Sequence, residues 1–269
     1  MSSAKEIKIY LKPKPEIDKI IKKLHYSGKV CVGSQLNFGV YLRGILIGGL
    51  QFGKSIDIRR TGPTIGCGMH DYLELNRMAI ADVGIKNVES RSISYCLNFI
   101  KKNYPFIKAV LSFADATQCG DGTIYRASGF KLIQINKNKS ILKVDDELIA
   151  KKSLDHVMLS NGKYLSSLLK SGTIADKTLN DFKLPNGKSA LSLINAKPMP
   201  GFQFKYVYYF DKEIEAKQKF IPFSEIPKEA KMYLGIGVSS KEIVASGVQP
   251  EEEGANPIDT LQNSNEIKP

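Results

Sequence analysis

The residues best suited to chemistry cluster in SFADATQCGDGTIYRASGF, residues 112 to 130. Here an apolar run typical of a buried strand delivers Ser112 and Asp115 at its end, and Tyr125 follows a glycine-bracketed turn. Polar groups at such a strand end often line a ligand site. Asp115 could equally serve only as a turn or cap residue of the next helix. Asp115 and Tyr125 are therefore candidates for proton transfer, with the structural interpretation left open.

Three further polar residues, His25, Tyr26 and Glu74, lie in or next to predicted elements. His25 and Tyr26 follow an amphipathic helix, in which apolar residues recur at helical spacing between positions 17 and 24. A lone histidine at such a helix end is more often a partner of the helix dipole than a catalyst. Glu74 lies on one face of a predicted strand, which is unremarkable unless a partner lies beside it. His25 and Glu74 are secondary candidates.

The segment from Asn87 to Ser92 begins the next long helix and could bind an anion. Backbone N–H groups of a first helical turn, together with the Ser90 and Arg91 side chains, suit a phosphate group. Ordinary capping by Asn87 or Ser90 explains the same residues almost as well.

Metal and nucleotide motifs are sparse. Cys67 and His70 have ligand-like spacing, but zinc needs four protein ligands, or three and a water in catalysis. We expect no structural zinc and leave a single labile metal open. The sequence lacks the His-x-Glu and Pro-Cys-x-x-Cys pair of zinc deaminases, a Walker loop, and a GxGxxG motif after a strand.

Cysteine usage and hydropathy indicate where the chain works. The four cysteines are scattered singly, as is usual in a reducing compartment. No run approaches the roughly 18 to 20 apolar residues of a membrane span, and the first residues lack a signal-peptide pattern. We therefore expect a cytoplasmic protein with no membrane partner.

Positive charge is concentrated on the body of the protein. The 269 residues carry a formal net charge of +12, and residues 240 to 269 contribute −4, which leaves +16 on the rest. This excess suits phosphate-rich partners, although basic proteins without such partners are common.

The hydrophobic pattern predicts one compact α/β unit. Strands and helices alternate irregularly and include an early hairpin, which does not fit a strictly alternating doubly wound sheet. The glycine-rich segment from Gly53 to His70 is predicted to be a loop. The expected elements are strands at 6–11, 36–42, 45–52, 72–81, 106–113 and 130–135, and helices starting near 15, 88 and 123.

The chain divides into three parts. Residues 1–149 form the expected catalytic core. Residues 150–235 are an elaboration packed on it and a candidate for recognising the context of a phosphate-rich partner. Their tyrosine-rich segment FKYVYYFD could return a strand to the core sheet. Residues 236–269 are expected to form an acidic, flexible tail.

Taken together, these segments resemble the Mom proteins of phages and prophages, which modify adenine in DNA. The matching segments run in family order over roughly residues 10 to 225, and the SFAD…GTIYRASGF stretch is the most distinctive. The others are HYSGK, GVYLRGILIGGLQFG, YLELNRMAIAD, KNVESRSISYCL and KYVYYFDK.

The resemblance implies a fold like that of the GNAT acyltransferases. Their central sheet is mostly antiparallel and splayed, with helices on both faces and a ligand cleft between the two central strands. In typical members a Q/R-x-x-G-x-G/A loop binds the pyrophosphate of acetyl-CoA. Residues 82–90 here read DVGIKNVES and lack that pattern, so ordinary use of acetyl-CoA is not expected.

The resemblance also implies an activity and a set of residue roles. A Mom-like protein converts adenine in double-stranded DNA to its N6-carbamoylmethyl derivative, which shields phage DNA from restriction, and the target base must leave the duplex. By this resemblance, Asp115 is the proton acceptor or base-orienting carboxylate, and Tyr125 is the acid or hydrogen-bond donor. Ser112 and Tyr26 are positioning groups that face the same cleft, and His25 and Glu74 are further candidates. The donor-binding residues are Ser90, Arg91 and Asn87.

The group donor is the least defined part of this expectation. Glycyl-tRNA suits an acyl-transfer scaffold and a basic surface, so tRNA is a second candidate partner. Iron has been associated with the family, but the sequence shows no ligand set for it.

Two other functions compete with this one. A CoA-dependent N-acetyltransferase acting on a protein or small amine would bind CoA tightly and leave DNA unchanged. A non-catalytic phage DNA-binding protein would bind DNA in a salt-sensitive way and also leave its bases unchanged.

Overall fold

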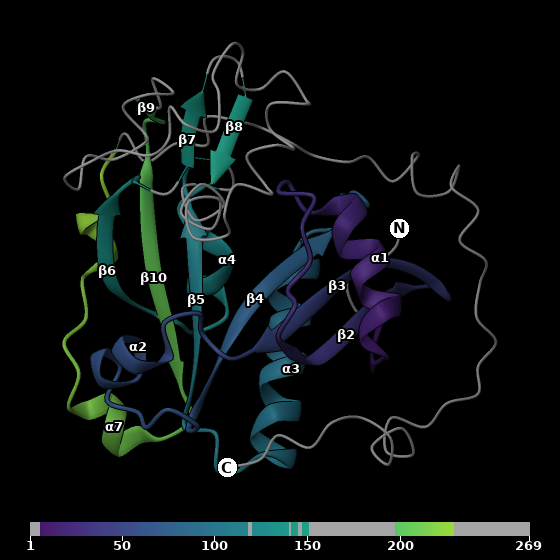
Figure 1. Ribbon diagram of the computed structural model, residues 1–269. Coiled ribbons are helices and arrows are strands. Elements are labelled where there is room, and N and C mark those ends of the chain that lie inside the picture. The colour runs from purple at the N-terminus through teal and green to yellow at the C-terminus, as the bar shows by residue number, and fades with distance from the viewer. Residues whose placement is uncertain (1–5, 118–119, 140, 145–146, 151–196, 229–269) are drawn as a thin grey trace, which may run out of the picture.

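The computed structural model describes residues 6–117, 120–139, 141–144, 147–150 and 197–228 (Figure 1). The acidic tail and residues 151–196 of the predicted elaboration lie outside the described residues. The elements are β1 (Ile7–Leu11), α1 (Lys14–Leu24), β2 (Ser34–Leu42), β3 (Ile45–Gly53), α2 (Ile58–Thr64), β4 (Tyr72–Ile80), α3 (Val88–Asn103), β5 (Ala109–Asp115), α4 (Thr123–Ala127), β6 (Lys131–Lys137), β7 (Ile141–Val144), β8 (Glu147–Ala150), β9 (Lys197–Pro198), β10 (Phe202–Tyr209), α7 (Lys212–Ala216) and the 3₁₀ helix η5 (Phe223–Glu225).

A mixed sheet organises the described residues. Seven strands lie in the order β1-β2-β3-β4-β5-β10-β6, and β7, β8 and β9 form a separate small sheet. Every neighbouring pair of the large sheet is antiparallel except β4 and β5, which are parallel. The predicted class, an α/β fold with a mostly antiparallel central sheet, is confirmed.

The parallel pair opens along its length. β4 and β5 pair only where Tyr72–Glu74 meet Ala109–Leu111. Beyond that point β4 continues to Ile80 against β3, and β5 continues to Asp115 against β10. The two halves of the sheet therefore separate on the carboxyl side of both strands, which is the splay that the GNAT resemblance implies.

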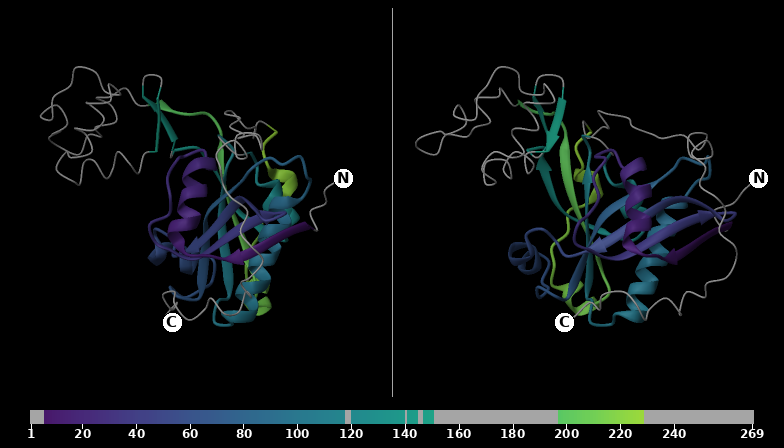
Figure 2. Two further views of the ribbon diagram at one scale, coloured as in Figure 1. Left: turned by 90° about the vertical axis from the view of Figure 1, so that its right-hand side faces the viewer. Right: turned by 45° about the vertical axis from the view of Figure 1, so that its right-hand side comes forward.

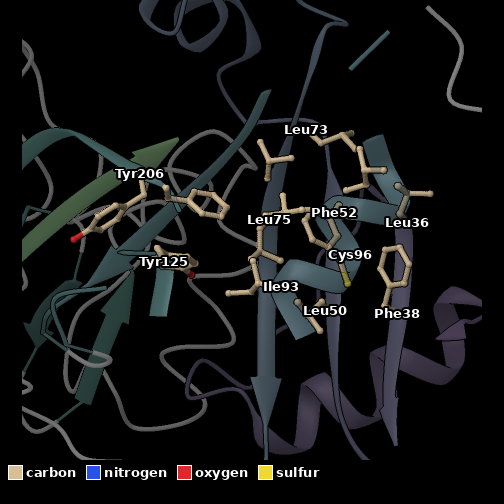
Figure 3. Close-up of a cluster of buried hydrophobic side chains, with 14 of the residues drawn as sticks. Leu36, Phe38, Leu50, Phe52, Leu73, Leu75, Ile93, Cys96, Tyr125 and Tyr206 are labelled. Carbon is tan, nitrogen blue, oxygen red and sulfur yellow. The ribbon is translucent and has the colours of Figure 1, made fainter. Parts of the chain in front are cut away.

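Helices cover both faces of the sheet. α3 and α4 pack on one face and α1 on the other, as Figure 2 shows for α1 and α3. α2 and α7 cover the same face as α1, farther along β4, β5 and β10. The larger core lies under α3 and is drawn in Figure 3, where Ile93 and Cys96 meet Phe38, Phe52 and Leu75. Each fully buried large apolar side chain there contributes roughly 1.5 to 3 kcal/mol.

One helix differs from the pattern read in the sequence. The segment from Gly53 to His70, predicted to be a loop, contains α2. Gly62 and Pro63 disfavour a helix by propensity, but Ile58 packs against the cluster under β4 and β5, and this packing outweighs propensity. The tyrosine-rich segment, predicted to return a strand to the core sheet, does so as β10, which is inserted between β5 and β6.

Candidate active site

A cleft of about 680 Å³ opens where β4 and β5 separate. This volume lies in the range of sites that hold small organic ligands. Residues from the end of α1, the middle of β4, the end of β5, the start of α4 and β10 line it. Five sequence candidates from four separate segments are among them: His25, Tyr26, Glu74, Asp115 and Tyr125.

Asp115 ends β5 and is partly buried in the cleft wall. Its Oδ1 atom accepts a 3.0 Å hydrogen bond from the Thr117 backbone N–H, so it does perform the turn role considered above. Burial raises the pKa of this carboxyl above its ordinary value, and the hydrogen bonds from Thr117 only partly oppose that effect. A carboxylate with a raised pKa is a stronger proton acceptor, so Asp115 combines a turn role with a suitable basicity.

Tyr125 places a phenol in the same cleft. Its ring packs against Phe130 and Tyr206, with centroids 5.5 Å away in both cases, and Figure 3 shows the two tyrosines side by side. The Tyr125 hydroxyl donates to the Phe113 carbonyl at 3.5 Å, a long bond that a substrate could readily replace. The ring is therefore held by packing while its hydroxyl stays at the cleft.

His25 caps α1 and is neutral at physiological pH. Burial, assisted by the nearby Arg77 guanidinium, lowers the pKa of His25 to about 4. The Ser27 backbone N–H donates to Nδ1 at 3.2 Å, so the neutral ring carries its proton on Nε2. An uncharged ring gains little from the helix dipole. At neutral pH His25 is instead a hydrogen-bond donor beside Tyr26, whose ring centroid lies 4.2 Å from its own.

The low pKa of His25 predicts a loss of stability in acid. The unfolded chain takes up a proton near pH 6.5 and the folded chain only near pH 4, so stability is full above pH 6.5 and falls between these values. After allowance for partial exposure, we expect about 2 kcal/mol of loss from this group at pH 4.5. Urea unfolding at pH 7 and pH 4.5 should show a smaller loss for His25→Gln than for the unmodified chain. Equal losses would contradict the assignment.

Glu74 has the partners that its sequence position could not reveal. The Ser55 hydroxyl donates to Glu74 Oε2 at 2.6 Å, and the Glu74 side chain is almost fully buried. The negative charge of Glu74 also acts on the Lys205 ammonium on β10: it raises the pKa of Lys205, although burial, the larger effect, lowers that pKa. Glu74 is therefore a buried, hydrogen-bonded acid in the cleft wall rather than an isolated surface acid.

Ser112 differs from the expectation that it faces the cleft. Its side chain is fully buried and lies on the other face of β5 from Asp115, in a strand where alternate residues point to opposite faces. The Oγ atom has no hydrogen-bond partner among the described residues. Ser112 is not among the residues that line the cleft.

Replacing Ser112 with alanine should therefore leave adenine modification unchanged. It removes a buried hydroxyl that gains nothing from a partner, so the free energy of unfolding should stay the same or rise by about 1 kcal/mol. Thermal melting and nucleoside analysis of DNA from expressing cells test both parts. A large loss of modification with an unchanged melting temperature would restore Ser112 as a functional residue.

The predicted donor-binding residues lie at the start of α3 and do not line the cleft. Asn87 has a left-handed backbone, with φ of 67°, and its side chain makes no capping hydrogen bond. Ser90 donates from its hydroxyl to the Asn87 carbonyl, and its own carbonyl accepts from Ser128 at the end of α4. Arg91 is exposed. A donor that reaches both this turn and the cleft would have to extend along α4.

No metal site emerges from the described part of the chain. Within it, no three His, Cys, Asp or Glu side chains are placed to hold one ion. Burial raises the pKa of Cys67 to about 12, which disfavours the thiolate a metal would need. His70 is paired instead with Lys54, at 3.4 Å between Nδ1 and Nζ. These residues do not fit an iron centre, and no step proposed below involves one.

The cleft residues that were not singled out in the sequence include Arg77, Phe113 and Gln203. Arg77 on β4 donates from Nε to the Lys29 carbonyl and so ties the loop after α1 to the cleft. Phe113 and Gln203 lie on β5 and β10 and also line it. Arg77 stands in an alternating strand, where its face could have been noticed, whereas the roles of Phe113 and Gln203 depend on the pairing of β5 with β10.

No helix among the described residues is long and apolar enough to cross a membrane.

The solved structures that this chain is similar to include acetyltransferases. One is a Bacillus subtilis acetyltransferase in complex with CoA, which is 9% identical and has a TM-score of 0.41 over 76% of this chain and 99% of that one. Another is a putative streptothricin acetyltransferase from Bacillus anthracis with acetyl coenzyme A, 10% identical, with a TM-score of 0.36 over 78% of this chain and 100% of that one. Similarities this low say nothing about ligand or activity.

Sequence comparisons are more specific. The methylcarbamoylase mom of Escherichia phage Mu is 40% identical over 118 residues, which are 42% of this chain and 48% of that protein. The chain thus spans about half the length of the curated relative it matches. The model of the Mom protein family matches residues 6–228, which include the splayed sheet and every described residue of the cleft. The chain therefore belongs to the Mom protein family.

Proposed function

We propose that this protein modifies adenine in double-stranded DNA at N6 to give the carbamoylmethyl derivative, and so protects phage DNA from restriction. The observation that carries the proposal is the convergence of His25, Tyr26, Glu74, Asp115 and Tyr125 on one cleft. The name of the phage Mu relative, a methylcarbamoylase, supports the product class. The net charge of +12 suits a DNA partner.

Adenine is a demanding substrate. Its amino group is a poor nucleophile, because the lone pair is delocalised into the ring, and in a duplex the group is also paired and stacked. The base must be extruded into the cleft, at a cost of a few kcal/mol. A site for this chemistry has to remove a proton from N6 and to stabilise negative charge on the group that N6 attacks.

The cleft residues divide between these two tasks. Asp115, with its raised pKa, accepts the N6 proton. The Tyr125 hydroxyl and the Nε2–H of neutral His25 are donors suited to an oxygen that gains negative charge. Arg77 adds positive charge to the same wall.

For the donor, we propose glycyl-tRNA. N6 would attack the glycyl ester carbonyl, forming an amide and releasing the tRNA. The free glycyl amine would then attack C6, the original C6–N6 bond would break, and the displaced nitrogen would become the carboxamide of the product. Atoms balance without an oxidant or reductant. Ser90, Arg91 and Asn87 remain the proposed donor contacts.

Mass analysis of nucleosides from cells that express this chain tests the proposal. We expect a modified adenine whose mass corresponds to the carbamoylmethyl group, and label from isotopic glycine in that group. Unmodified DNA would overturn the function, and an unlabelled product would overturn only the donor. Tightly bound CoA with unmodified DNA would instead indicate an N-acetyltransferase, and salt-sensitive DNA binding with unmodified bases would indicate a non-catalytic binder.

A further inference from the structure

Phe113 is exposed in a strand that is otherwise almost entirely buried. In β5, the residues from Ala109 to Ser112 and Ala114 are buried, whereas the side chain of Phe113 is 45% exposed. Its ring lines the cleft where β4 has separated from β5. A large aromatic side chain left exposed in a cleft is a surface available for stacking.

The surroundings of Phe113 suit a nucleotide. Lys205, the residue directly opposite on β10, holds its ammonium 5.6 Å from the centroid of the Phe113 ring. Asp115 follows two residues later on the same face of β5, a separation of about 7 Å along the strand. A planar base lying on Phe113 would therefore present one edge toward Asp115, with the Lys205 ammonium beside the stacking ring.

Gln203 supplies an amide at that edge. It lies directly opposite Asp115 in the antiparallel pairing of β10 with β5 and lines the same cleft. Directly opposite residues in such a pair have Cβ atoms about 5 Å apart, so one ligand edge can touch both side chains. A glutamine amide is complementary to adenine, since its oxygen accepts from N6–H and its nitrogen donates to a ring nitrogen.

We propose that Phe113 and Gln203 form the adenine subsite: the extruded base stacks on the Phe113 ring, and the Gln203 amide hydrogen-bonds the edge that carries N6. This inference rests on the proposed function and specifies how the cleft chooses a purine with an exocyclic amine. Asp115 then meets the N6 proton because Gln203 fixes the edge beside it.

Matched variants test the stacking surface in cells. Phe113→Ala should lower the fraction of modified adenine by about 5-fold to 150-fold, the range expected for loss of one base–aromatic stack, and Phe113→Tyr should retain most of it. Phe223→Ala is the control, because Phe223 is 41% exposed, has the Arg126 guanidinium 5.6 Å from its ring, and is not among the cleft-lining residues. It should modify DNA like the unmodified chain.

The edge contact has its own variant and control. Gln203→Met keeps a similar volume but removes the amide, and should also lower modification by about 5-fold or more. Gln134→Met makes the same change on β6, outside the cleft, and should have no effect. Normal levels of modified adenine with Phe113→Ala or Gln203→Met would overturn the corresponding contact. If the wild-type chain produced no modified adenine, the proposed function would be overturned and this subsite with it.

A spectroscopic readout separates stacking from a structural role. The chain contains no tryptophan, so Phe113→Trp and Phe223→Trp each carry a single fluorophore. Genomic DNA from unmodified host cells should quench the emission of Trp at position 113, whereas poly(dG)·poly(dC), which binds through phosphates but lacks adenine, should not. Neither DNA should quench the control. Equal emission changes with both DNAs at position 113, at saturating binding, would overturn stacking on adenine.

Discussion

Asp115→Asn is expected to lower adenine modification by a factor of about 100 to 10,000, the usual contribution of a positioned general base. The amide keeps the shape of the side chain and its oxygen can still accept the Thr117 N–H, so the turn after β5 should persist. What is lost is the ability to take up a proton. Nucleoside mass analysis of cellular DNA measures the effect.

The same substitution should not weaken the fold. Because the pKa of Asp115 is raised by burial, the folded chain holds the charged form less readily than the unfolded chain does, and the charge destabilises the fold at neutral pH. Removing the charge should leave the melting temperature unchanged or higher. A residue that costs stability but is needed for activity is typical of a functional site.

A matched aspartate provides the control for this prediction. Asp82 makes the same local contact, since its Oδ1 atom accepts a 2.9 Å hydrogen bond from the backbone N–H two residues on, at Gly84. Asp82 does not line the cleft. Asp82→Asn should therefore leave modification intact. If Asp115→Asn were fully active, or if both variants lost activity equally, Asp115 would have no role in proton transfer.

Gly122→Ala is expected to have the largest effect on stability. Gly122 has φ of 81°, and a Cβ atom there would overlap Cε2 of the Tyr206 ring and lie 3.0 Å from the Ala114 Cβ. Tyr206 cannot easily move, because its ring is fully buried and its hydroxyl donates to the Asp121 carbonyl at 2.5 Å. Left-handed backbone strain and overpacking together should cost about 2 to 5 kcal/mol.

This cost should appear as a melting temperature lowered by roughly 5 to 15 °C, with loss of modification, because residues 120–125 form one wall of the cleft. Gly120→Ala separates the two causes. Gly120 has φ of 87° in the same loop, but a Cβ atom there meets nothing within 4 Å. It should show the backbone cost alone, of about 1 to 2 kcal/mol. Equal melting temperatures for the two variants would show that contact with Tyr206 is not the cause.

Much of the fold could be predicted from local patterns. α1, the β2–β3 hairpin and α3 are long elements with clear periodicity, and the sequence predicts each of them near its observed bounds. The short helix α2 could not be predicted, since its stability comes from packing against distant strands. The insertion of β10 between β5 and β6 could not be predicted either, because strand order depends on contacts far apart in the chain.

The site residues also divide into those that local sequence patterns reveal and those that depend on how distant strands pair. Asp115, Tyr125 and His25 could be found because polar residues gather at the ends of predicted elements, and the cleft does bring them together. Ser112 was misplaced because the sequence does not reveal which face of β5 points toward the cleft. Phe113 was missed because a phenylalanine in an apolar strand looks like a core residue until the strand neighbours are known. Gln203 was missed because only the pairing of β10 with β5 places it opposite Asp115.

The position of β10 has a consequence for how the protein is made. Among the described strands of the large sheet, β6 has only β10 as a neighbour, and one side of β5 is also closed only by β10. At about 5 to 20 residues per second, a ribosome takes roughly 5 to 20 s to go from the end of β5 to the end of β10. During that interval the nascent chain presents an open strand edge, which can pair with other chains. The cleft would then be complete only late in synthesis. A chaperone that covered the open strand edge during this interval would raise the yield of active enzyme.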